Sequence, residues 1–569
     1  MMPPVNLPTP ALVTQRAAQR LPRWALMLLC AAYLLPGQFG REPWKNADIT
    51  AFGYMASIAE GRSPWTAPAV AGLSGDGALL PYWLGALSIK LLPFVDPANA
   101  ARVPFALLLA ATLALIWYST LHLARTEAAQ PVAFAFGGEA APLDYARALA
   151  DGAVLATIAS LGLLQLGHET TPELVQLSGV ALFMWVLAAA PTRPRLAAVS
   201  AVVALMVVAA SGAPTIALAL GAGGFILCQG SRYPGAKGLR PGLVLGMLAG
   251  AVVAAAGHAW AWRAGLHWNS AWELLRLGAW FLWPGWLLAL WTLWRWRKHL
   301  VYRHIAVPSV GVAVALVASL TMGGSDRALM LAVPGIAVLA AFALPTLKRS
   351  AGSAIDWFSV FFFTALAVLI WVFYMGMMTG TPAKPAARIA ALLPGFEPHF
   401  SAPLLALAIA GTAAWLALVR WRTARVQHAL WKSLVLPASG VALSWLLLLT
   451  LGLPAIDYAR SYRPWVYLVA QHVPNGVCVA AQLPRSALAA LESYTNWHID
   501  ADGDVAATSA CPYLLVDENR HSPVSAPPGW VLVAHLHRPS ERDESTAVFR
   551  KADAPKPRPA DFGRVAAAR

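Results

Sequence analysis

The sequence has unusually few charged residues. Only 12% of its 569 residues are Asp, Glu, Lys or Arg, whereas about 25% is usual in a soluble domain. This shortage excludes a water-soluble enzyme. It also excludes a disordered or coiled-coil protein, because both need more charge and fewer aliphatic residues. Since 58% of the residues are hydrophobic, the composition predicts a polytopic membrane protein.

Cysteine and the common catalytic motifs are also scarce. The chain has four cysteines and no Cys-x-x-Cys pair. This argues against a cysteine-bound metal, because structural zinc needs four correctly spaced ligands. No glycine-rich phosphate loop, Gly-x-Ser-x-Gly turn or His-Glu-x-x-His pair occurs. The sequence therefore gives no support for energy coupling by ATP.

The formal charge of +15 comes from basic residues in short clusters between apolar runs. In a soluble chain this charge would suggest a nucleic-acid partner, but clusters at the ends of apolar runs are typical topology signals. We therefore expect membrane lipids around the chain and no nucleic acid.

Thirteen apolar runs approach the length of about 20 residues that a helix needs to cross the bilayer. They are Leu21–Gln38, Ala101–Ala124, Ala148–Leu166, Leu174–Ala190, Leu196–Ser211, Pro214–Gln229, Leu243–Trp260, Leu277–Trp296, Ile305–Met322, Ala328–Thr346, Ile355–Met375, Pro403–Arg420 and Ser433–Leu453. The basic clusters follow every second run, so this side and the tail 1–20 are predicted to be cytoplasmic. The expected architecture is an all-α transmembrane domain, 21–453, in a bacterial inner membrane.

An odd number of spans places two long polar stretches outside: the first loop, 39–100, and everything after Leu453. Within the loop, Pro81–Pro93 is too short to cross and is rich in interfacial aromatic residues. It predicts a helix lying in the membrane surface. The first run has no small-x-small cleavage site, so we expect an uncleaved first helix.

Residues 454–551 predict a small α/β domain on the periplasmic side. Strand patterns at 477–482, 513–516 and 530–536 surround a helical pattern at 485–494, and Asp457–His472 also has helical spacing. Cys478 and Cys511 each stand at a strand start in an oxidising compartment, which suggests a disulfide. Two unpaired core thiols are the alternative. The tail 552–569 lacks periodicity and is expected to be disordered.

Ionised residues on the outer side are the candidates for chemistry, because positive-inside bias does not explain them. The densest group is Arg41–Asp48. Asp48 is the first candidate for a general base, with Glu42 beside it, and Lys45 could neutralise a phosphate. The alternative is a solvated loop in which Glu42 pairs with Arg41 or Lys45.

Weaker candidates lie in the same loop, in two short outer turns and in a Trp-rich stretch. A tight turn bearing Arg327 can aim a guanidinium at a phosphate, whereas a lone His168 is more often a helix-end residue than a base. The tryptophans of residues 260–286 are typical of an interfacial belt. The set comprises Arg62, Asp76, His168, Glu169, Arg276, Asp326 and Arg327.

Several short motifs occur in a characteristic order. After the charged group at 41–48 come Tyr82-Trp-Leu-Gly-Ala86, Ala100-Ala-Arg-Val-Pro-Phe-Ala106, His168-Glu-Thr-Thr-Pro-Glu-Leu174, Ser325-Asp-Arg327 and Asp356-Trp-Phe358. This order resembles the GT-C membrane glycosyltransferases, in the branch related to the aminoarabinose transferase of lipid A and to protein O-mannosyltransferases. The likeness covers nearly the whole chain.

The resemblance implies an inverting glycosyltransferase. Such an enzyme takes a sugar from a polyprenyl-phosphate carrier on the outer face and transfers it to a lipid or glycan acceptor of the envelope. In the family an acidic residue of the first loop serves the acceptor or a metal, and basic groups hold the carrier phosphate. The resemblance thus implies Asp48 and Glu42 as catalytic residues and Lys45, Arg62 and Arg327 as phosphate ligands. Asp76, His168, Glu169, Asp326 and Arg276 would contact donor or acceptor. No cofactor is required, although a divalent metal would be compatible.

The sequence departs from the family pattern at three positions. Ala47 stands where an acidic partner of Asp48 is expected, Gly77 replaces a phosphate-holding lysine, and Met330 replaces a tyrosine. A second hypothesis is therefore a catalytically inactive relative that binds carrier lipid or scaffolds an envelope assembly. A transporter fits less well, because most charges lie at the ends of the runs rather than in the bilayer centre.

Overall fold

The computed structural model describes residues 9–231, 233, 235–260, 269–424, 429–501, 505–519 and 525–554. The chain forms two compact units made of interleaved segments. Unit 1 comprises Met1–Gly37, Phe105–Leu369 and Pro403–Thr450, and unit 2 comprises Gln38–Pro104, Ile370–Ala402 and Leu451–Arg569. The first outer loop and the C-terminal segment, far apart in sequence, therefore belong to the same unit.

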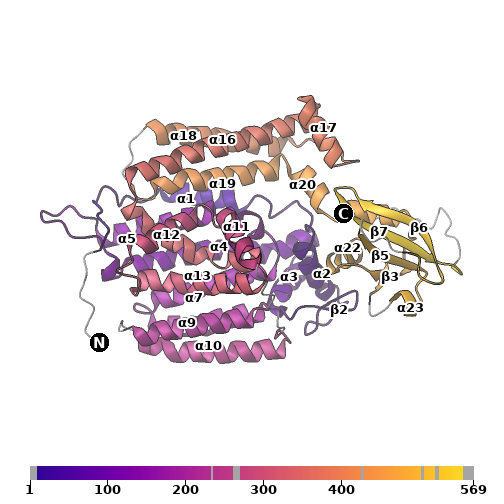
Figure 1. The fold of residues 1–569 in the computed structure, drawn as a ribbon, viewed down its shortest axis with the longest axis horizontal. Coiled ribbons are helices and arrows are strands. Elements are labelled where there is room, and N and C mark those ends of the chain that lie inside the picture. Colours follow the sequence, from indigo (N-terminus) through magenta and orange to yellow (C-terminus); the bar gives the residue numbers. More distant parts are fainter. Residues whose placement is uncertain are drawn as a thin grey trace. The chain divides into compact units, whose positions relative to one another are not determined.

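Unit 1 is helical, and its long helices run roughly parallel to one another (Figure 1). Its elements are α1 (Arg23–Leu34), η1 (Glu127–Ala129), α5 (Pro142–Ala159), α6 (Leu163–Leu166), α7 (Pro172–Ala189), α8 (Pro194–Ala210), α9 (Pro214–Gly230), α10 (Ala236–Ala256), α11 (Asn269–Phe281), α12 (Gly285–Arg295), α13 (Arg303–Thr321), α14 (Asp326–Met330), α15 (Val333–Ala343), η2 (Leu344–Thr346), α18 (Ala402–Ala424) and α19 (Lys432–Thr450). Helices α4 (Pro97–Ala124) and α16 (Arg349–Thr379) each belong partly to both units.

All thirteen apolar runs fall on helices, but the helices differ in length. Among the described residues, α4, α7, α10, α13, α16, α18 and α19 are long and apolar enough to cross a membrane, which makes seven. The pair α11 and α12, bent by 103°, makes an eighth if it forms one span. The other five runs fall on α1, α5, α8, α9 and α15, of which α1 has only 12 residues. The multi-pass architecture is confirmed. Length and composition by themselves mark seven or eight of the described helices as spans, and the count of thirteen stays a prediction.

Proline marks the start of several helices in unit 1. Helices α5, α7, α8 and α9 begin at Pro142, Pro172, Pro194 and Pro214. Proline suits the first helical turn, because its fixed φ is helical and its missing N–H would have no intrahelical acceptor there. Each of these prolines therefore fixes the point at which a loop ends and a helix begins.

A row of glycines brings α10 against α8. Gly242, Gly246 and Gly250 recur every fourth residue and so lie on one face of α10. A Cβ added at Gly242 would lie 2.7 Å from the carbonyl oxygen of Ala198, and one at Gly246 would lie 3.1 Å from that of Ala201. Such small-xxx-small faces allow close backbone approach inside membranes, where lipid gives no hydrophobic drive for helices to associate.

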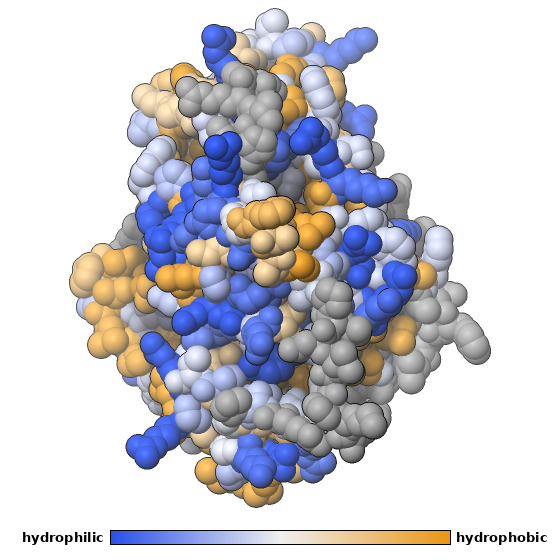
Figure 2. Space-filling model, turned by 90° about the vertical axis from the view of Figure 1, so that its left-hand side faces the viewer, coloured by the Kyte–Doolittle hydropathy of each residue, from blue (hydrophilic) through white to orange (hydrophobic). Residues whose placement is uncertain are grey.

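The surface of unit 1 matches a bilayer environment. Figure 2 looks onto the end of the molecule that is on the left of Figure 1, where many hydrophilic side chains are exposed and apolar ones lie among them and along part of the rim. Loops of this unit carry exposed basic residues such as Arg125, Arg193 and Lys348. Phe361 and Val368 on α16 are exposed apolar side chains, as lipid-facing positions require.

In unit 2 the first outer loop forms α2 (Ala47–Ala59), the short hairpin strands β1 (Ala69–Val70) and β2 (Leu73–Ser74), and α3 (Leu79–Leu91). The helix predicted at Pro81–Pro93 is thus present, and its position in the membrane surface stays a prediction. Helix α3 can approach α2 closely because Gly85 lacks a side chain, and a Cβ there would overlap Met55. Helix α17 (Ala383–Leu392) also belongs to this unit.

The C-terminal part of unit 2 is a mixed α/β structure, as predicted. Its elements are α20 (Leu453–Arg460), α21 (Arg463–Ala470), β3 (Cys478–Gln482), α22 (Arg485–Tyr494), β4 (His498–Asp500), α23 (Val505–Thr508), β5 (Tyr513–Asn519), β6 (Trp530–Arg538) and β7 (Glu541–Lys551). The strand order is β4-β3-β5-β7-β6. Strand β3 is parallel to β4 and β5, whereas β7 is antiparallel to β5 and β6.

Three details of this region differ from the sequence-based expectation. The helix expected over Asp457–His472 is two helices, because Pro464 in the first turn of α21 cannot donate the hydrogen bond that would continue α20. Strand β7 was missed because its first half, Glu541–Ser545, is nearly all charged or polar. The short strand β4 was also missed. From residue 555 onward, the tail expected to be disordered lies outside the described residues.

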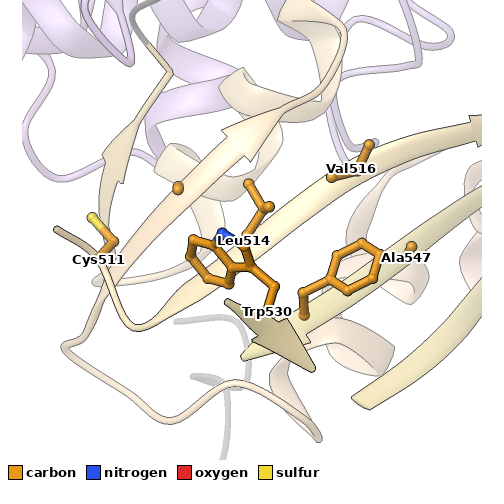
Figure 3. Close-up of a cluster of buried hydrophobic side chains, with 7 residues drawn as sticks. Cys511, Leu514, Val516, Trp530 and Ala547 are labelled. Atoms are coloured by element: carbon orange, nitrogen blue, oxygen red, sulfur yellow. The ribbon is translucent and has the colours of Figure 1, made fainter. Parts of the chain in front are cut away.

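The core of this sheet is a group of buried side chains from β3, β5, β6 and β7 and from the residue Cys511 before β5 (Figure 3). It contains Ala480, Cys511, Leu514, Val516, Trp530, Ala547 and Phe549, all buried. Cys478 packs against this cluster and forms a disulfide with Cys511, with the two Cα atoms 4.9 Å apart. The disulfide joins the start of β3 to the residues just before β5, at the amino ends of these two parallel strands.

We predict that Gly242→Ala destabilises unit 1. The added methyl group would meet the Ala198 carbonyl oxygen, which belongs to the backbone of α8 and cannot rotate away. Overpacking of this kind costs about 1–3 kcal/mol. The thermal unfolding midpoint of the detergent-purified protein should therefore fall.

Gly238→Ala in the same helix is the matched control. No atom lies within 4 Å of a Cβ added there, and alanine is the better helix former by roughly 0.5–1 kcal/mol. Its midpoint should stay the same or rise. Equal losses in the two variants would show that helix propensity, and not contact with α8, sets the effect.

Candidate active site

The candidate site in unit 2 begins with a buried ion pair. The guanidinium of Arg41 donates to Asp48 Oδ2 at 2.7 Å, and both side chains are only 1% exposed. The same carboxylate oxygen accepts the backbone N–H of Trp44 at 3.1 Å. Asp48 stands in the first turn of α2, where the helix dipole also favours a negative charge. These three interactions hold the carboxylate in one position.

Arg102, near the start of α4, supports this pair by binding the backbone of Arg41. Its guanidinium donates to the backbone oxygen of Arg41 at 2.7 Å, and the residue is 1% exposed. It also donates to the side chain of Asn99 at 3.3 Å. Arg102 belongs to the Ala100–Ala106 motif, so the motif contributes a cation that orders the backbone around Arg41.

The carboxylate of Asp457 is a second acid beside this pair. Both of its oxygens accept the backbone N–H of Glu42, at 3.0 and 3.1 Å, and Oδ1 accepts the indole N–H of Trp44 at 2.9 Å. Burial raises the pKa of Asp457 to about 6, although these hydrogen bonds act in the opposite direction. Asp457 is therefore an acid that changes charge near neutral pH.

Sequence reasoning did not include Asp457 among the candidate residues. It appeared there only as the first residue of the helical pattern Asp457–His472. One signal was available: it is the first acidic residue after α19, on the side already assigned to the outer loop. What the sequence could not reveal was that the backbone of Glu42, more than 400 residues earlier, lies within hydrogen-bond distance.

Glu42 connects the first loop to the C-terminal region. Its Oε2 accepts the hydroxyl of Tyr494 at 2.7 Å, and its Oε1 pairs with Arg463 at 2.9 Å. Burial and the nearby Glu42 raise the pKa of Tyr494 well above its usual value, so this phenol stays a donor. The alternative in which Glu42 pairs with Arg41 or Lys45 is not what the structure shows. We refer to Arg41, Glu42, Asp48 and Asp457 as the loop cluster.

The three cations predicted to hold a phosphate already have carboxylate partners. Lys45 pairs with Glu541 and Glu544. Arg62 pairs with Glu60 and Glu492. In unit 1, Arg327 pairs with Glu169 at 2.7 Å and Glu173 at 3.5 Å. A phosphate at any of these residues would have to compete with these carboxylates.

Arg460 differs from those three cations. Its guanidinium lies 5.5 Å from the centre of the Trp44 ring, whose surroundings also include Arg41 at 4.4 Å. None of the ion pairs formed among the described residues involves Arg460. It lies three residues after Asp457 on α20, so the two side chains project from neighbouring positions on one helix face. Sequence reasoning gave no weight to Arg460.

The remaining candidates do not join the loop cluster. His168 is 2% exposed, and its ring nitrogens lie 2.7 and 2.9 Å from the backbone oxygens of Leu164 and Tyr33. This is the environment of a helix-end residue held in the bundle of unit 1. Asp326 and Arg276 are exposed in the same unit. In unit 2, Asp76 pairs with Arg485 at 2.8 Å.

The sequence allowed for a divalent metal, but the described part of the chain shows no site for one. There, no three His, Cys, Asp or Glu side chains are arranged to hold an ion. Glu42 and Asp48 are instead occupied by arginines, as shown by the pairs with Arg463 and Arg41. Their carboxylates do not fit a metal-ligand set, so no step of the chemistry is assigned to a metal.

We predict that Asp48→Asn strongly lowers the free energy of unfolding. Removing one partner leaves the Arg41 guanidinium buried and without a counter-charge, which costs about 3–5 kcal/mol. The effect should appear as a lower unfolding midpoint. Asp76→Asn is the control, since its pair with Arg485 has side-chain exposures of 50% and 44%. An exposed pair contributes about 0–1 kcal/mol. Equal losses would contradict the structural role given to the Arg41–Asp48 pair.

Comparisons with known proteins agree with this architecture. No protein-family model matches the sequence, and no curated protein matches it. The crystal structure of ArnT from Cupriavidus metallidurans bound to undecaprenyl phosphate is similar over 94% of this chain and 98% of its own, with 13% identity and a TM-score of 0.60. The apo structure of the same protein is similar over 92% and 96%, with 14% identity and a TM-score of 0.57.

Arabinosyltransferase EmbB from Mycobacterium smegmatis, solved by cryo-electron microscopy, is also similar, with 15% identity over 89% of this chain and 46% of its own. Its TM-score of 0.39 is too low to carry an argument. The two ArnT structures are enough to confirm the resemblance in fold: the chain has the fold of the GT-C membrane glycosyltransferases, of which ArnT is an example.

Proposed function

We propose that this protein is an inner-membrane glycosyltransferase that moves a sugar from a polyprenyl-phosphate carrier to a lipid or glycan acceptor on the periplasmic face. The observation that carries the proposal is Asp457, an acid with a pKa of about 6 held between the backbone of Glu42 and the indole of Trp44. The fold shared with ArnT supports it, because one ArnT structure contains undecaprenyl phosphate.

Asp457 is the general base in this proposal. As a carboxylate it takes the proton of an acceptor hydroxyl while that oxygen attacks the anomeric carbon of the donor. The bond between this carbon and the phosphate oxygen breaks, and the phosphate leaves on the polyprenyl carrier. A base with a pKa close to the working pH is effective, because it is largely deprotonated yet still basic enough to accept a proton. The donors from Glu42 and Trp44 fix the direction of the carboxylate.

Arg460 is the proposed ligand of the carrier phosphate. Its guanidinium can bind two phosphate oxygens at once, and it need not be released from a carboxylate first. As the sugar leaves, charge grows on the phosphate, and a fixed cation stabilises that state more than the ground state. Lys45, Arg62 and Arg327 remain candidates only if a phosphate displaces their acidic partners.

Asp48 and Glu42 are assigned roles different from the ones first expected. The buried pair with Arg41 makes Asp48 a positioning residue, because it fixes the segment whose Glu42 backbone N–H and Trp44 indole hold Asp457. Glu42 acts in the same way through Tyr494 and Arg463. Either could still reach an acceptor if a substrate opened its pair, so both belong in the mutational test.

The location proposed is the periplasmic face of a bacterial inner membrane, with the N-terminus cytoplasmic. Its support is the placement of the basic clusters after every second apolar run. A lipid-linked sugar presents its phosphate at the membrane interface, where a charged residue is far less costly than in the bilayer centre. A site on the outer loop therefore suits this class of donor.

The second candidate function is a carrier-binding protein without transferase activity. The observation in its favour is that Lys45, Arg62 and Arg327 are all neutralised by carboxylates. In addition, Met330, at the position of the family's tyrosine, is fully buried. This protein would bind a polyprenyl phosphate but never release a free carrier from a sugar donor.

The test is transfer from labelled polyprenyl-phosphate sugar to a membrane extract by the purified protein in lipid vesicles. We expect Asp457→Asn to lower kcat by about 10²–10⁴-fold, the usual contribution of a general base. In the unaltered protein kcat/KM should rise with pH up to about 6 and then level off, because only the carboxylate accepts a proton. The variant should lose that dependence. Glu397→Gln, an exposed acid in the same unit, is the control and should change neither quantity.

Stability separates a catalytic effect from unfolding. The pKa of Asp457 is higher in the folded protein than the usual value of 3.8, so ionisation between pH 3.8 and 6 lowers the stability of the folded state. Replacing it by neutral asparagine should leave the unfolding midpoint at pH 7 unchanged or higher. Full activity of Asp457→Asn would remove Asp457 as the base. Tight carrier binding by the unaltered protein with no transfer would favour the second candidate.

A further inference from the structure

Unit 2 contains a cavity that the proposed transfer chemistry does not use. It has a volume of about 130 Å³ and lies between the residue before α2, the start of α21 and α22, and strands β5 to β7. Its lining includes Asn46, Tyr462, Ser486, Asp517 and Arg538. A volume of this size exceeds by several-fold the space that one buried water needs. It can therefore admit a small ring rather than a single water.

A second, more open hollow of about 310 Å³ adjoins it and shares Leu483, Pro484 and Asp517 with it. The shared residues follow the carboxyl end of β3 or lie in β5, and Ala501 of the second hollow follows β4. These are the three parallel strands of the sheet. In sheets with parallel strands, ligands bind at the carboxyl ends of the strands. The two hollows thus occupy the part of the sheet where a ligand is expected.

Three lining groups have unused hydrogen-bonding capacity. Arg538 is 3% exposed, and its Nε is buried without a hydrogen-bond partner. The side chain of Asn46 makes no capping bond to α2, although asparagine is among the best N-cap residues. Asp517 is exposed and forms none of the ion pairs found among the described residues. A buried N–H left unpaired costs free energy that a ligand can recover.

Asn46 also has a strained backbone, with φ of 69° and ψ of −112°. Positive φ is uncommon outside glycine, and such residues cluster at functional sites, where the surrounding structure holds them. The backbone N–H of Lys45, the preceding residue, donates to the Arg460 oxygen at 2.7 Å. This bond anchors the chain just before Asn46 and so helps to hold the Asn46 amide at the cavity.

The charges of the cavity are close to balanced. Arg538 pairs with Glu544 at 3.2 Å, and Lys45 also approaches Glu544. Among the lining residues that the structure describes, Asp517 is then the one charge without an ion-pair partner. A phosphate or carboxylate ligand would be repelled by Asp517. The hydroxyls of Tyr462 and Ser486 bond to each other at 3.0 Å, and each keeps capacity for a second hydrogen bond. The amide of Asn46 can donate and accept, while Asp517 accepts and Arg538 donates. This mixture of donors and acceptors matches a ligand made of neighbouring hydroxyl groups.

We propose that the cavity at the carboxyl ends of β3, β4 and β5 binds a neutral saccharide, with Asp517 and Asn46 hydrogen-bonded to adjacent sugar hydroxyls and Arg538 Nε donating to a ring or hydroxyl oxygen. The proposal concerns binding alone and needs no turnover. A site built to pair with hydroxyls discriminates strongly against ligands that lack them, because its own polar groups would be left unpaired. Specificity therefore rests on the hydroxyl pattern rather than on charge.

The test uses the full chain in detergent with free glucose, galactose, mannose and arabinose, and with methyl phosphate as the anionic probe. Saturation-transfer NMR should detect at least one sugar and should not detect methyl phosphate. Asp517→Asn keeps the size of the side chain but removes the charged acceptor, so the Kd should rise about tenfold or more. Asn46→Gly removes the amide while suiting the positive φ, and should weaken binding without loss of stability.

Asp553→Asn is the matched control. Asp553 is exposed and follows β7. It lies near the start of β5, at the end of the strands opposite the proposed site. It should bind the sugar as the unaltered protein does. Three results would overturn the proposal: no sugar bound by the unaltered protein, equal affinity in Asp517→Asn, or preferential binding of methyl phosphate. Transfer activity enters none of these readouts, so failure here is separate from failure of the glycosyltransferase assignment.

Discussion

The organisation of this protein depends on the cost of placing charge and unpaired backbone in hydrocarbon. Helices satisfy their own backbone groups, so the membrane part is a bundle of helices, and its few ionised residues lie mainly near helix ends. The same constraint favours clusters of ionised residues in the segments outside the apolar helices. Of the two units, unit 2 contains the first loop and the C-terminal region, and the loop cluster is built from these two segments.

Within that cluster a buried pair holds the geometry and a titrating acid is available for chemistry. Arg41 and Asp48 are almost fully buried, so each depends on the other for its charge to be tolerated. Their pairing fixes the short segment up to Trp44, and this segment donates to Asp457 through a backbone N–H and an indole. The Asp48 carboxylate is engaged by Arg41, whereas Asp457 has a pKa that burial raises to about 6, which suits a base. In the proposed function, structural and chemical roles thus fall on different carboxylates.

Sequence reasoning and the structure favour different acids of the same cluster. Asp48 was chosen because it lies in the densest charged group after the first apolar run, and composition alone cannot tell a buried ion pair from a free carboxylate. Lys45 was chosen as a phosphate ligand for the same reason, yet it pairs with Glu541 and Glu544, nearly 500 residues later. Asp457 and Arg460 were overlooked because their importance comes from contact with Glu42 and Trp44. Such contacts leave no local pattern.

The sequence by itself determined the class of this protein. Its low charge, long apolar runs, alternating basic clusters and ordered motifs were sufficient for a multi-pass GT-C-like fold with a small α/β region, because hydrophobic length and local periodicity are local properties. Only the tertiary structure decided which helices reach spanning length, how the predicted helix after Asp457 breaks, and that the polar segment 541–551 is a strand. It also decided which ionised groups are neutralised by a partner. Burial and pairing depend on residues hundreds of positions apart, and these set both the pKa of an acid and the availability of a cation.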